Sequence, residues 1–268
     1  MYLDYWGLNE KPFSNTSDPR FLCLSEQHNE ALTRLKYCVM SRNACAMLTG
    51  VFGTGKTLLA QALLESLPSD QYVKAFIFNP QLSATELLYE IIYQLGIRDQ
   101  APTSKTEALH RLSDILNDSY SEGRHTVIIV DEAHLIEDRL IFEELRLLLN
   151  FQRKEGFLLT LILLGQPELR EKIAHQKPFD QRISIRFHLK GLREEETHQY
   201  ILHRLRVAGA VRQIFDQEAI HAVHESTGGI PRRINQVCDL ALLSGYGMKA
   251  MVINGAVIRE VVMDPQTL

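Results

Sequence analysis

A glycine-rich run of eight residues carries the clearest chemistry in this sequence. From Gly50 to Thr57 it reads Gly-Val-Phe-Gly-Thr-Gly-Lys-Thr, the complete pattern G-x-x-x-x-G-K-[ST]. An apolar strand expected over 44–49 precedes it and a helix expected over 56–67 follows it, which is the context that a phosphate-binding loop requires. Glycines let backbone amides surround a phosphate chain, and the helix N-terminus adds partial positive charge.

The last residues of this loop have different expected tasks. We expect Lys56 to reach the β- and γ-phosphates of a nucleotide and Thr57 to bind Mg²⁺. A chance glycine-rich turn is the alternative, and the flanking strand and helix argue against it. The predicted nucleotide contacts of the loop are Gly50, Phe52, Gly53, Thr54, Gly55, Lys56, Thr57 and Leu58.

An apolar strand expected over 126–130 ends in two carboxylates. Asp131 is expected to hold Mg²⁺ through water, and Glu132 to orient and polarise the attacking water. Phosphoryl transfer needs positioning and charge neutralisation more than covalent help, so one carboxylate for the metal and one for the water is sufficient. His134 completes the letters Asp-Glu-Ala-His, and we expect it to be a loop histidine without a direct catalytic part.

A polar side chain follows the next apolar strand, which is expected over 157–164. Gln166 would lie beside the γ-phosphate if this strand neighbours the one that ends at Asp131. Because the reaction depends on positioning, we predict that Gln166 helps to hold the attacking water. A role in the loop that begins the next helix is the alternative.

Two segments contain arginines that could stabilise charge during phosphoryl transfer. Arg182 and Arg186 lie at the end of the α/β part, and a second segment, 228–233, reads Gly-Gly-Ile-Pro-Arg-Arg. There Pro231 suits the first turn of a helix, and Arg232 follows it. An arginine from a neighbouring subunit is worth about 10³–10⁵ in rate. An ordinary solvated surface arginine is the alternative for each of them.

The expected elements alternate until about residue 190. Strands are expected over 44–49, 72–78, 126–130 and 157–164, and helices over 26–42, 56–67, 84–95, 105–120 and 138–153. Continuous apolar strands that alternate with helices predict a parallel α/β sheet. After residue 190 we expect only helices, over 194–208, 216–226, 231–245 and 254–263. The predicted domains are an α/β core with an N-terminal arm over 1–190 and a small all-helical domain over 191–268.

Composition excludes several other classes of protein. The 268 residues contain 29 Lys and Arg and 33 Asp and Glu, so the formal net charge of −4 excludes a polybasic nucleic-acid binder. The four cysteines form no Cys-x-x-Cys pair, which argues against zinc or an iron–sulfur cluster and fits a reducing compartment. No signal-peptide pattern is visible, and no apolar run approaches the ~20 residues of a spanning helix, so a cytoplasmic location is expected.

Together these motifs resemble those of an AAA+ ATPase. The resemblance implies a P-loop NTPase core with a parallel sheet, a small C-terminal helical lid, ATP hydrolase activity, and ATP with Mg²⁺ as cofactors. By position, Gln166 resembles sensor 1, and Arg232 resembles the sensor 2 arginine of a Gly-x-Pro-Arg motif, with Pro231 beside it at the nucleotide. Arg182 resembles the trans-acting arginine finger, and Arg186 is its rival.

The N-terminal residues carry a narrower resemblance that extends over nearly the whole chain. Residues 5–13 read Tyr-Trp-Gly-Leu-Asn-Glu-Lys-Pro-Phe, followed by Asp-Pro-Arg-Phe at 18–21 and Ser-Glu-Gln-His-Asn-Glu-Ala-Leu at 25–32. The chain is similar to the ExeA/GspA-like secretion ATPases. The MshM proteins of pilus biogenesis and the TniB-type transposition ATPases share this subfamily.

In this subfamily the segment before the phosphate-binding loop helps to form the adenine pocket. The resemblance therefore makes Pro12, Phe13 and His28 candidate contacts of the base. A strapped-down arm and a histidine at a helix N-terminus are equally weighted alternatives for these residues.

The resemblance also implies a biological role. We expect a Mg-dependent ATPase that couples ATP binding and hydrolysis to type II secretion or pilus biogenesis, as a nucleotide-dependent homo-oligomer working with that machinery at the inner face of the bacterial inner membrane. A DNA-associated ATPase that regulates transposition is the alternative, but it needs a basic strip, and Lys74, Arg111, Lys154 and Lys190 are dispersed in the sequence. A scaffold that binds ATP without hydrolysing it is a third reading, which the intact Glu132 argues against.

Overall fold

A computed structural model describes residues 2–15, 19–21, 23–98, 102–154 and 156–263. The chain divides into two compact units. The sheet unit takes Gln27–Phe52 and Lys56–Leu189, and the helical unit takes Met1–Glu26, Gly53–Gly55 and Lys190–Leu268. Among the helices of the described ranges, none is long and apolar enough to cross a membrane.

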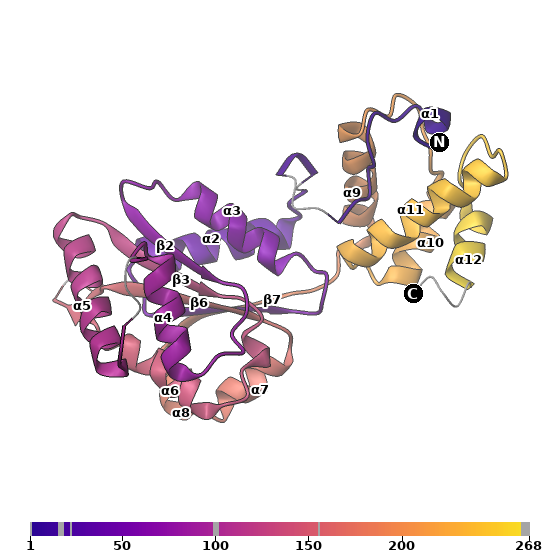
Figure 1. Cartoon of the computed structure of the whole chain (residues 1–268). Coiled ribbons are helices and arrows are strands. Elements are labelled where there is room, and N and C mark those ends of the chain that lie inside the picture. Colours follow the sequence, from indigo (N-terminus) through magenta and orange to yellow (C-terminus); the bar gives the residue numbers. More distant parts are fainter. Residues whose placement is uncertain (1, 16–18, 22, 99–101, 155, 264–268) are drawn as a thin grey trace. The chain divides into compact units, whose positions relative to one another are not determined.

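The sheet unit contains a parallel sheet of five strands in the order β2-β3-β6-β1-β7 (Figure 1). These strands are β1 (Cys45–Gly50), β2 (Tyr72–Ile77), β3 (His125–Val130), β6 (Leu159–Gly165) and β7 (Ile183–Leu189). The remaining elements are α2 (Glu26–Met40), α3 (Lys56–Ser66), α4 (Ala84–Gln94), α5 (Lys105–Ser121), η2 (Ala133–Leu135), α6 (Arg139–Leu148), α7 (Glu168–Ala174), α8 (Lys177–Asp180), and a short hairpin of β4 (Gln152–Arg153) and β5 (Gly156–Phe157).

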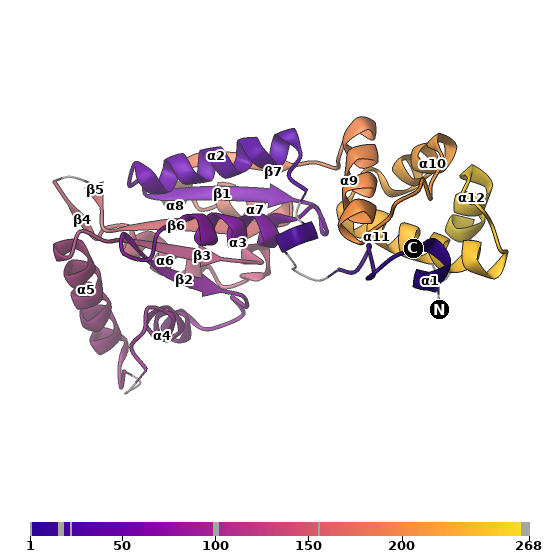
Figure 2. The ribbon, with the colours of Figure 1, turned by 90° about the horizontal axis from the view of Figure 1, so that it is seen from above.

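Helices cover both faces of this sheet. Alternate residues of β1, β3 and β6 belong to an apolar core shared with α4 to α8, because successive side chains of a strand point to opposite faces. Helices α2 and α3 cover the other face (Figures 1 and 2). Strands β1, β3 and β6 are buried along their whole length, which explains why they read as continuous apolar runs.

The predicted α/β parallel-sheet class is confirmed, with two local differences. Strand β7 was not expected, although Ile183, Ile185, Phe187 and Leu189 alternate with polar residues, the pattern of a half-buried edge strand. The helix expected over 138–153 ends at Leu148, and the expectation was wrong over its last residues. Asn150 is a residue type that favours turns over helix, and the chain then enters the β4–β5 hairpin.

The helical unit is built from α1 (Tyr2–Trp6), η1 (Pro19–Phe21), α9 (Glu194–Val207), α10 (Gln217–Thr227), α11 (Pro231–Gly247) and α12 (Gly255–Met263). The four helices expected after residue 190 are all present. Their core also contains side chains from the N-terminal arm, namely Trp6, Leu8, Phe13 and Phe21. The arm therefore packs on these helices, whereas the sequence analysis grouped it with the sheet.

A buried arginine explains why the arm belongs to the helical unit. Arg204, on α9, is only 4% exposed. Its guanidinium donates to the backbone oxygens of Pro12 at 2.5 Å and Ser14 at 2.7 Å, and to the Tyr200 hydroxyl at 2.8 Å. It also lies over the ring of Phe21, 4.8 Å from the ring centre. Hydrogen bonds to a charged donor are the stronger kind, so this side chain ties residues 12–14 of the arm firmly to α9.

Replacing Arg204 should destabilise the helical unit. Arg204→Ala removes the donor of the buried Pro12 carbonyl and of the buried Tyr200 hydroxyl, together with the bond to the Ser14 carbonyl, so we expect a loss of about 2–4 kcal/mol in the free energy of unfolding. The protein has a single tryptophan, and Trp6 lies in the core of this unit. Urea unfolding followed by tryptophan fluorescence therefore reports on it.

Arg206, which is exposed on the same helix, provides the matched control. Arg206→Ala should change the free energy of unfolding by no more than about 0.5 kcal/mol. Equal unfolding midpoints for the two variants would show that Arg204 does not hold the arm.

Candidate functional site

The carboxyl ends of three adjacent strands bring the predicted site residues to one edge of the sheet. Strand β6 pairs with β1 on one side and with β3 on the other, and both pairings are parallel. The residues that follow β1, β3 and β6 therefore emerge side by side. This meets the condition set for Gln166, whose strand is a direct neighbour of the one that ends at Asp131. Ligands of open parallel sheets bind at this kind of edge.

The glycine-rich loop runs from the end of β1 to the start of α3. Gly53 and Gly55 have φ angles of +85° and +96°, a region that residues with a side chain rarely adopt. The spacing of glycines in the motif is therefore required by the backbone itself. Helix α3 begins at Lys56, so the loop ends at a helix N-terminus, where free amides and the helix dipole favour a phosphate.

The Lys56 ammonium is buried at the base of this loop. It donates to the backbone oxygens of Gly50 at 2.9 Å and Val51 at 3.2 Å. Burial lowers the pKa of Lys56 below its usual value, while the carboxylates of Glu132, Asp131 and Glu168 act in the opposite direction. These carboxylates are therefore close enough to influence the ammonium electrostatically.

Thr57 and Asp131 meet directly. The Thr57 hydroxyl donates to Asp131 Oδ2 at 2.6 Å, and the Glu132 backbone amide donates to Asp131 Oδ1 at 2.8 Å. The Asp131 amide in turn donates to the Ile77 carbonyl at the end of β2. A hydroxyl and a carboxylate in contact are hard oxygen donors of the kind that Mg²⁺ accepts. The residues present thus fit the magnesium ion that the motif implies.

Glu132 follows Asp131 with a left-handed backbone, at φ +50° and ψ +32°. Such a conformation is uncommon for a residue other than glycine, and strained backbone of this kind is enriched at functional sites. The side chain is 31% exposed, and its Oε2 lies 3.3 Å from Nδ1 of His134. A partly exposed carboxylate beside the Asp131 position is what a residue that orients water requires.

Gln166 comes directly after β6 and contacts His134. Its amide nitrogen lies 3.0 Å from Nε2 of that histidine. The sheet edge therefore brings together Lys56, Thr57, Asp131, Glu132 and Gln166. Their individual roles in catalysis stay predictions.

Of the two candidate finger arginines, Arg182 lies near the opposite end of the strands, and Arg186 lies in the middle of β7, opposite Met47 of β1. Arg182 precedes β7, whose first residue, Ile183, pairs with Cys45 at the start of β1. The Arg182 guanidinium donates to the Asn150 side chain at 3.2 Å. Arg186 is held more firmly, because it forms an ion pair with Asp180 at 2.9 Å and donates to the backbone oxygen of the same residue at 2.7 Å.

The remaining predicted contacts lie partly in the helical unit. Phe13 is 2% exposed in the core of that unit, edge-on to Phe215, which fits the strapped-down arm that was the alternative role. Pro231 is the first residue of α11, as expected, and Arg232 is the second. His28 lies in α2 of the sheet unit and is buried. Their contacts with adenine or phosphate stay predictions.

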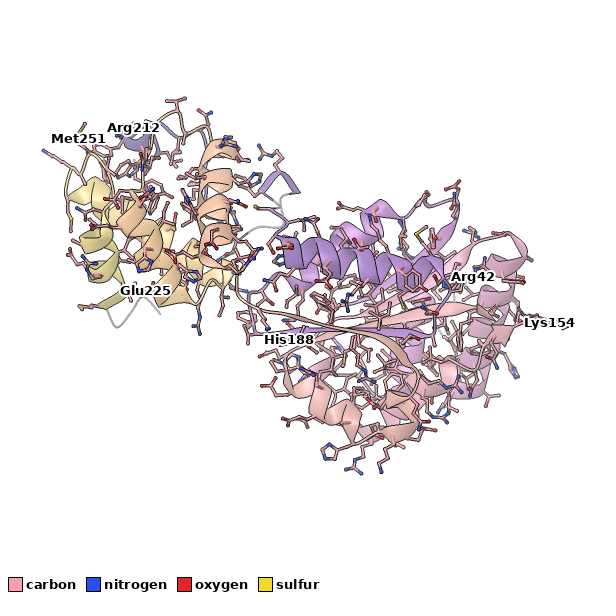
Figure 3. The ribbon with its side chains drawn as sticks, turned by 180° about the vertical axis from the view of Figure 1, so that it is seen from behind. Arg42, Lys154, His188, Arg212, Glu225 and Met251 are labelled. Carbon is pink, nitrogen blue, oxygen red and sulfur yellow. The ribbon has the colours of Figure 1, made fainter. Side chains whose placement is uncertain are left out.

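Sequence reasoning missed two polar contacts near this edge. Lys172, on α7, donates to the backbone oxygens of His134 and Ile136. Thr49, next to the end of β1, lies 3.0 Å from His188 of β7, and Figure 3 labels His188 at this end of the sheet unit. Neither contact has a local sequence signal, because each joins residues far apart in the chain.

Comparison with known families identifies the chain. A model described as an AAA domain matches residues 39–173, which is half of the sequence. The chain belongs to this AAA domain family. The AAA+ family that the motifs predicted is thereby confirmed.

Two curated proteins are similar to parts of this AAA domain chain. General secretion pathway protein A of Aeromonas hydrophila is 38% identical over 253 residues, which cover 92% of this chain and 45% of that protein. An uncharacterized HTH-type transcriptional regulator of Methanocaldococcus jannaschii is 27% identical over 154 residues, covering 56% of this chain and 37% of that protein. The chain thus spans less than half the length of either relative.

Two solved structures have a fold similar to that of this chain. The ORC2 protein of Aeropyrum pernix is 18% identical, with a TM-score of 0.68 over 96% of this chain and 72% of that chain. The RuvB branch migration motor of Thermotoga maritima is 17% identical, with a TM-score of 0.56 over 90% of this chain and 68% of that chain. At these identities the likeness concerns the fold alone.

Removing the buried ammonium should weaken nucleotide binding. For Lys56→Ala we expect the Kd for MgATP to rise about 10- to 100-fold, since a charge-assisted hydrogen bond contributes about 1.5–3 kcal/mol. Equilibrium titration with a fluorescent ATP analogue measures this. Lys154→Ala is the control, because it removes the same charge from an exposed position at the far end of the sheet unit (Figure 3). An unchanged Kd for Lys56→Ala would contradict the assignment.

Proposed function

We propose that this chain is a Mg-dependent ATPase that couples ATP binding and hydrolysis to assembly or secretion across the cell envelope. The ATPase part of this proposal rests on the hydrogen bond between Thr57 and Asp131, with Glu132 and Gln166 at the same edge of the sheet. This edge combines a phosphate-binding loop, oxygen donors for a divalent cation and a carboxylate for water.

Each residue has a distinct task in the proposed reaction. Thr57 and Asp131 would hold Mg²⁺, which supplies neutralisation of the phosphate charge when it is bound. Lys56 neutralises the β- and γ-phosphates from within the loop, and Gln166 holds the attacking water in line. Glu132 orients and polarises that water through its partly exposed carboxylate.

The bond changes of hydrolysis are simple. The water oxygen forms a bond to the γ-phosphorus, and the bond between this phosphorus and the β,γ-bridging oxygen breaks. ADP and inorganic phosphate leave, and one proton of the water is released. Because no covalent enzyme intermediate is needed, positioning and electrostatics account for the catalysis.

The cellular process is supported by the likeness to general secretion pathway protein A, which extends over 92% of this chain. We propose type II secretion or pilus biogenesis as the process, with the machinery of that process as partner. ATP hydrolysis at the sheet edge would drive an assembly step of such machinery.

The position of the arginines supports an oligomeric enzyme. Because β7 is parallel to β1, Arg182 lies roughly 20 Å, the length of a seven-residue strand, from the edge that carries Thr57. It is too far to serve the site of its own chain. We therefore infer that Arg182 acts on ATP bound to a neighbouring subunit of a homo-oligomer. Arg186 is the weaker candidate because its guanidinium already pairs with Asp180.

Substituting Glu132 tests the catalytic assignment. Glu132→Gln keeps the size of the side chain but removes its charge, so kcat should fall about 10²- to 10⁴-fold while the affinity for ATP stays within about twofold. Release of inorganic phosphate measures kcat. Glu171→Gln, an exposed glutamate on α7, is the control. Equal turnover of the wild type and Glu132→Gln would remove Glu132 from the mechanism.

The same variant tests the cellular process. Host cells that carry Glu132→Gln at the chromosomal locus should export fewer exoproteins or display fewer pili than the wild type. Unchanged export and piliation would contradict the secretion role even if the purified enzyme hydrolyses ATP. A change in transposition frequency instead would favour the DNA-associated alternative.

A mixing experiment tests the action of Arg182 in trans. Arg182→Ala should lose hydrolysis by up to about 10³-fold but keep its affinity for ATP. Mixing it with Glu132→Gln should restore activity, because one chain then supplies an intact site and the other an intact arginine. Arg186→Ala is the comparison variant. Activity no greater than the sum of the two separate proteins, or restoration only with Arg186→Ala, would overturn the assignment.

A further inference from the structure

His134 lies between the two residues expected to position the attacking water. Its ring is 11% exposed. One ring nitrogen, Nε2, is 3.0 Å from the amide nitrogen of Gln166, and the other, Nδ1, is 3.3 Å from Oε2 of Glu132. The imidazole thus bridges a side chain that follows β6 and a side chain that follows β3.

The chemistry of these neighbours selects one form of the ring. A neutral imidazole donates from one nitrogen and accepts at the other. The Gln166 amide nitrogen can only donate, so Nε2 accepts, and the ring proton resides on Nδ1, facing the Glu132 carboxylate. Turning the Gln166 amide over would reverse this order and set the Nδ1 lone pair against a carboxylate oxygen. The negative charge of Glu132 therefore favours the Nδ1–H tautomer.

The backbone around His134 is held in place from α7 and β6. Lys172 donates to the backbone oxygens of His134 and, at 2.9 Å, of Ile136. At Gly165, the last residue of β6, an added Cβ would come within 2.8 Å of the Leu169 side chain and 3.3 Å of the His134 amide nitrogen. The end of β6 and the turn that carries His134 are therefore in close contact, which fixes the ring between its two partners.

Nδ1 of His134 and Oε2 of Glu132 lie close together without forming a regular hydrogen bond. Within the described residues, neither Oε2 of Glu132 nor Nδ1 of His134 forms a hydrogen bond of normal geometry, although both atoms are buried. Each buried atom would gain from closing the remaining gap, because an unpaired buried polar atom is unfavourable by about 1–3 kcal/mol. A hydrogen bond from Nδ1 of His134 to Oε2 of Glu132 would therefore satisfy both atoms at once.

We propose that His134 is a positioning residue that links Gln166 to the catalytic carboxylate. This inference rests on the proposed ATPase function. The imidazole holds Oε2 of Glu132 and leaves Oε1 for the water, and it acts only through Glu132. A displacement of Gln166 changes the hydrogen bond at Nε2. This in turn changes the interaction between Nδ1–H and the Glu132 carboxylate. The residue at the expected γ-phosphate sensor position is thereby coupled to the residue that orients water.

Three substitutions of His134 separate its two contacts. Alanine removes both; asparagine places an amide near the Nδ1 position and keeps the Glu132 contact; glutamine places one near Nε2 and keeps the Gln166 contact. We expect His134→Ala to lower kcat roughly 10- to 100-fold with KM within about twofold, and His134→Asn to retain more activity than His134→Gln. His175→Ala, an exposed histidine at the end of α7, should match the wild type.

A double variant tests whether His134 acts through Glu132. In a Glu132→Gln background, adding His134→Ala should cause no further loss of kcat, because residues that act as a unit are not additive. A His134→Ala variant with wild-type kcat, or a loss that multiplies with that of Glu132→Gln, would overturn the proposal.

A measurement that needs no turnover distinguishes this proposal from the proposed function. In ¹⁵N NMR of the histidine rings, His134 of the full chain should show the Nδ1–H tautomer, and Gln166→Ala should shift it toward Nε2–H. If the wild type hydrolyses ATP but His134 shows the Nε2–H tautomer, the link is wrong and the ATPase function stands. If neither the wild type nor Glu132→Gln hydrolyses ATP, the proposed function fails, whatever the tautomer.

Discussion

The parallel pairing of β1, β6 and β3 is the constraint on which this site depends. It directs three chain segments to the same edge of the sheet, and the hydrogen bond between Thr57 and Asp131, which are 74 residues apart, joins the outer two. A shift in the register of any of these strands would separate the loop from the carboxylates. Helices on both faces bury the strands, and that burial keeps the register unique.

The sequence predicted the parts of this arrangement that have a local signal. Fully buried strands appear as apolar runs, and the residues Lys56, Thr57, Asp131 and Glu132 combine a residue type with a spacing, so all of these could be found. Strand β7 was missed because it lies at the edge and is only half-buried. Its alternating pattern, from Ile183 onward, was nevertheless visible. The bonds of Lys172 to the turn at His134 depend on tertiary packing and left no trace in the sequence.

The N-terminal arm shows a second limit of local reasoning. Its glycine, proline and asparagine residues predicted an irregular segment, and this part is correct. The partner of residues 12–14 is set largely by Arg204, almost 200 residues later, through its bonds to Pro12 and Ser14. A buried guanidinium with several acceptors specifies one path for a segment that has few regular hydrogen bonds of its own. The conformation of Pro12 and Phe13 is thus governed by the helical unit.

The left-handed backbone of Glu132 has a consequence for how this protein balances stability against activity. At φ +50° a side chain is unfavourable by about 1–2 kcal/mol relative to glycine. A glycine at this position would relieve that strain and give a more stable chain without a carboxylate to orient water. The fold therefore keeps backbone strain at the residue where the chemistry is expected, and selection for stability alone would remove it.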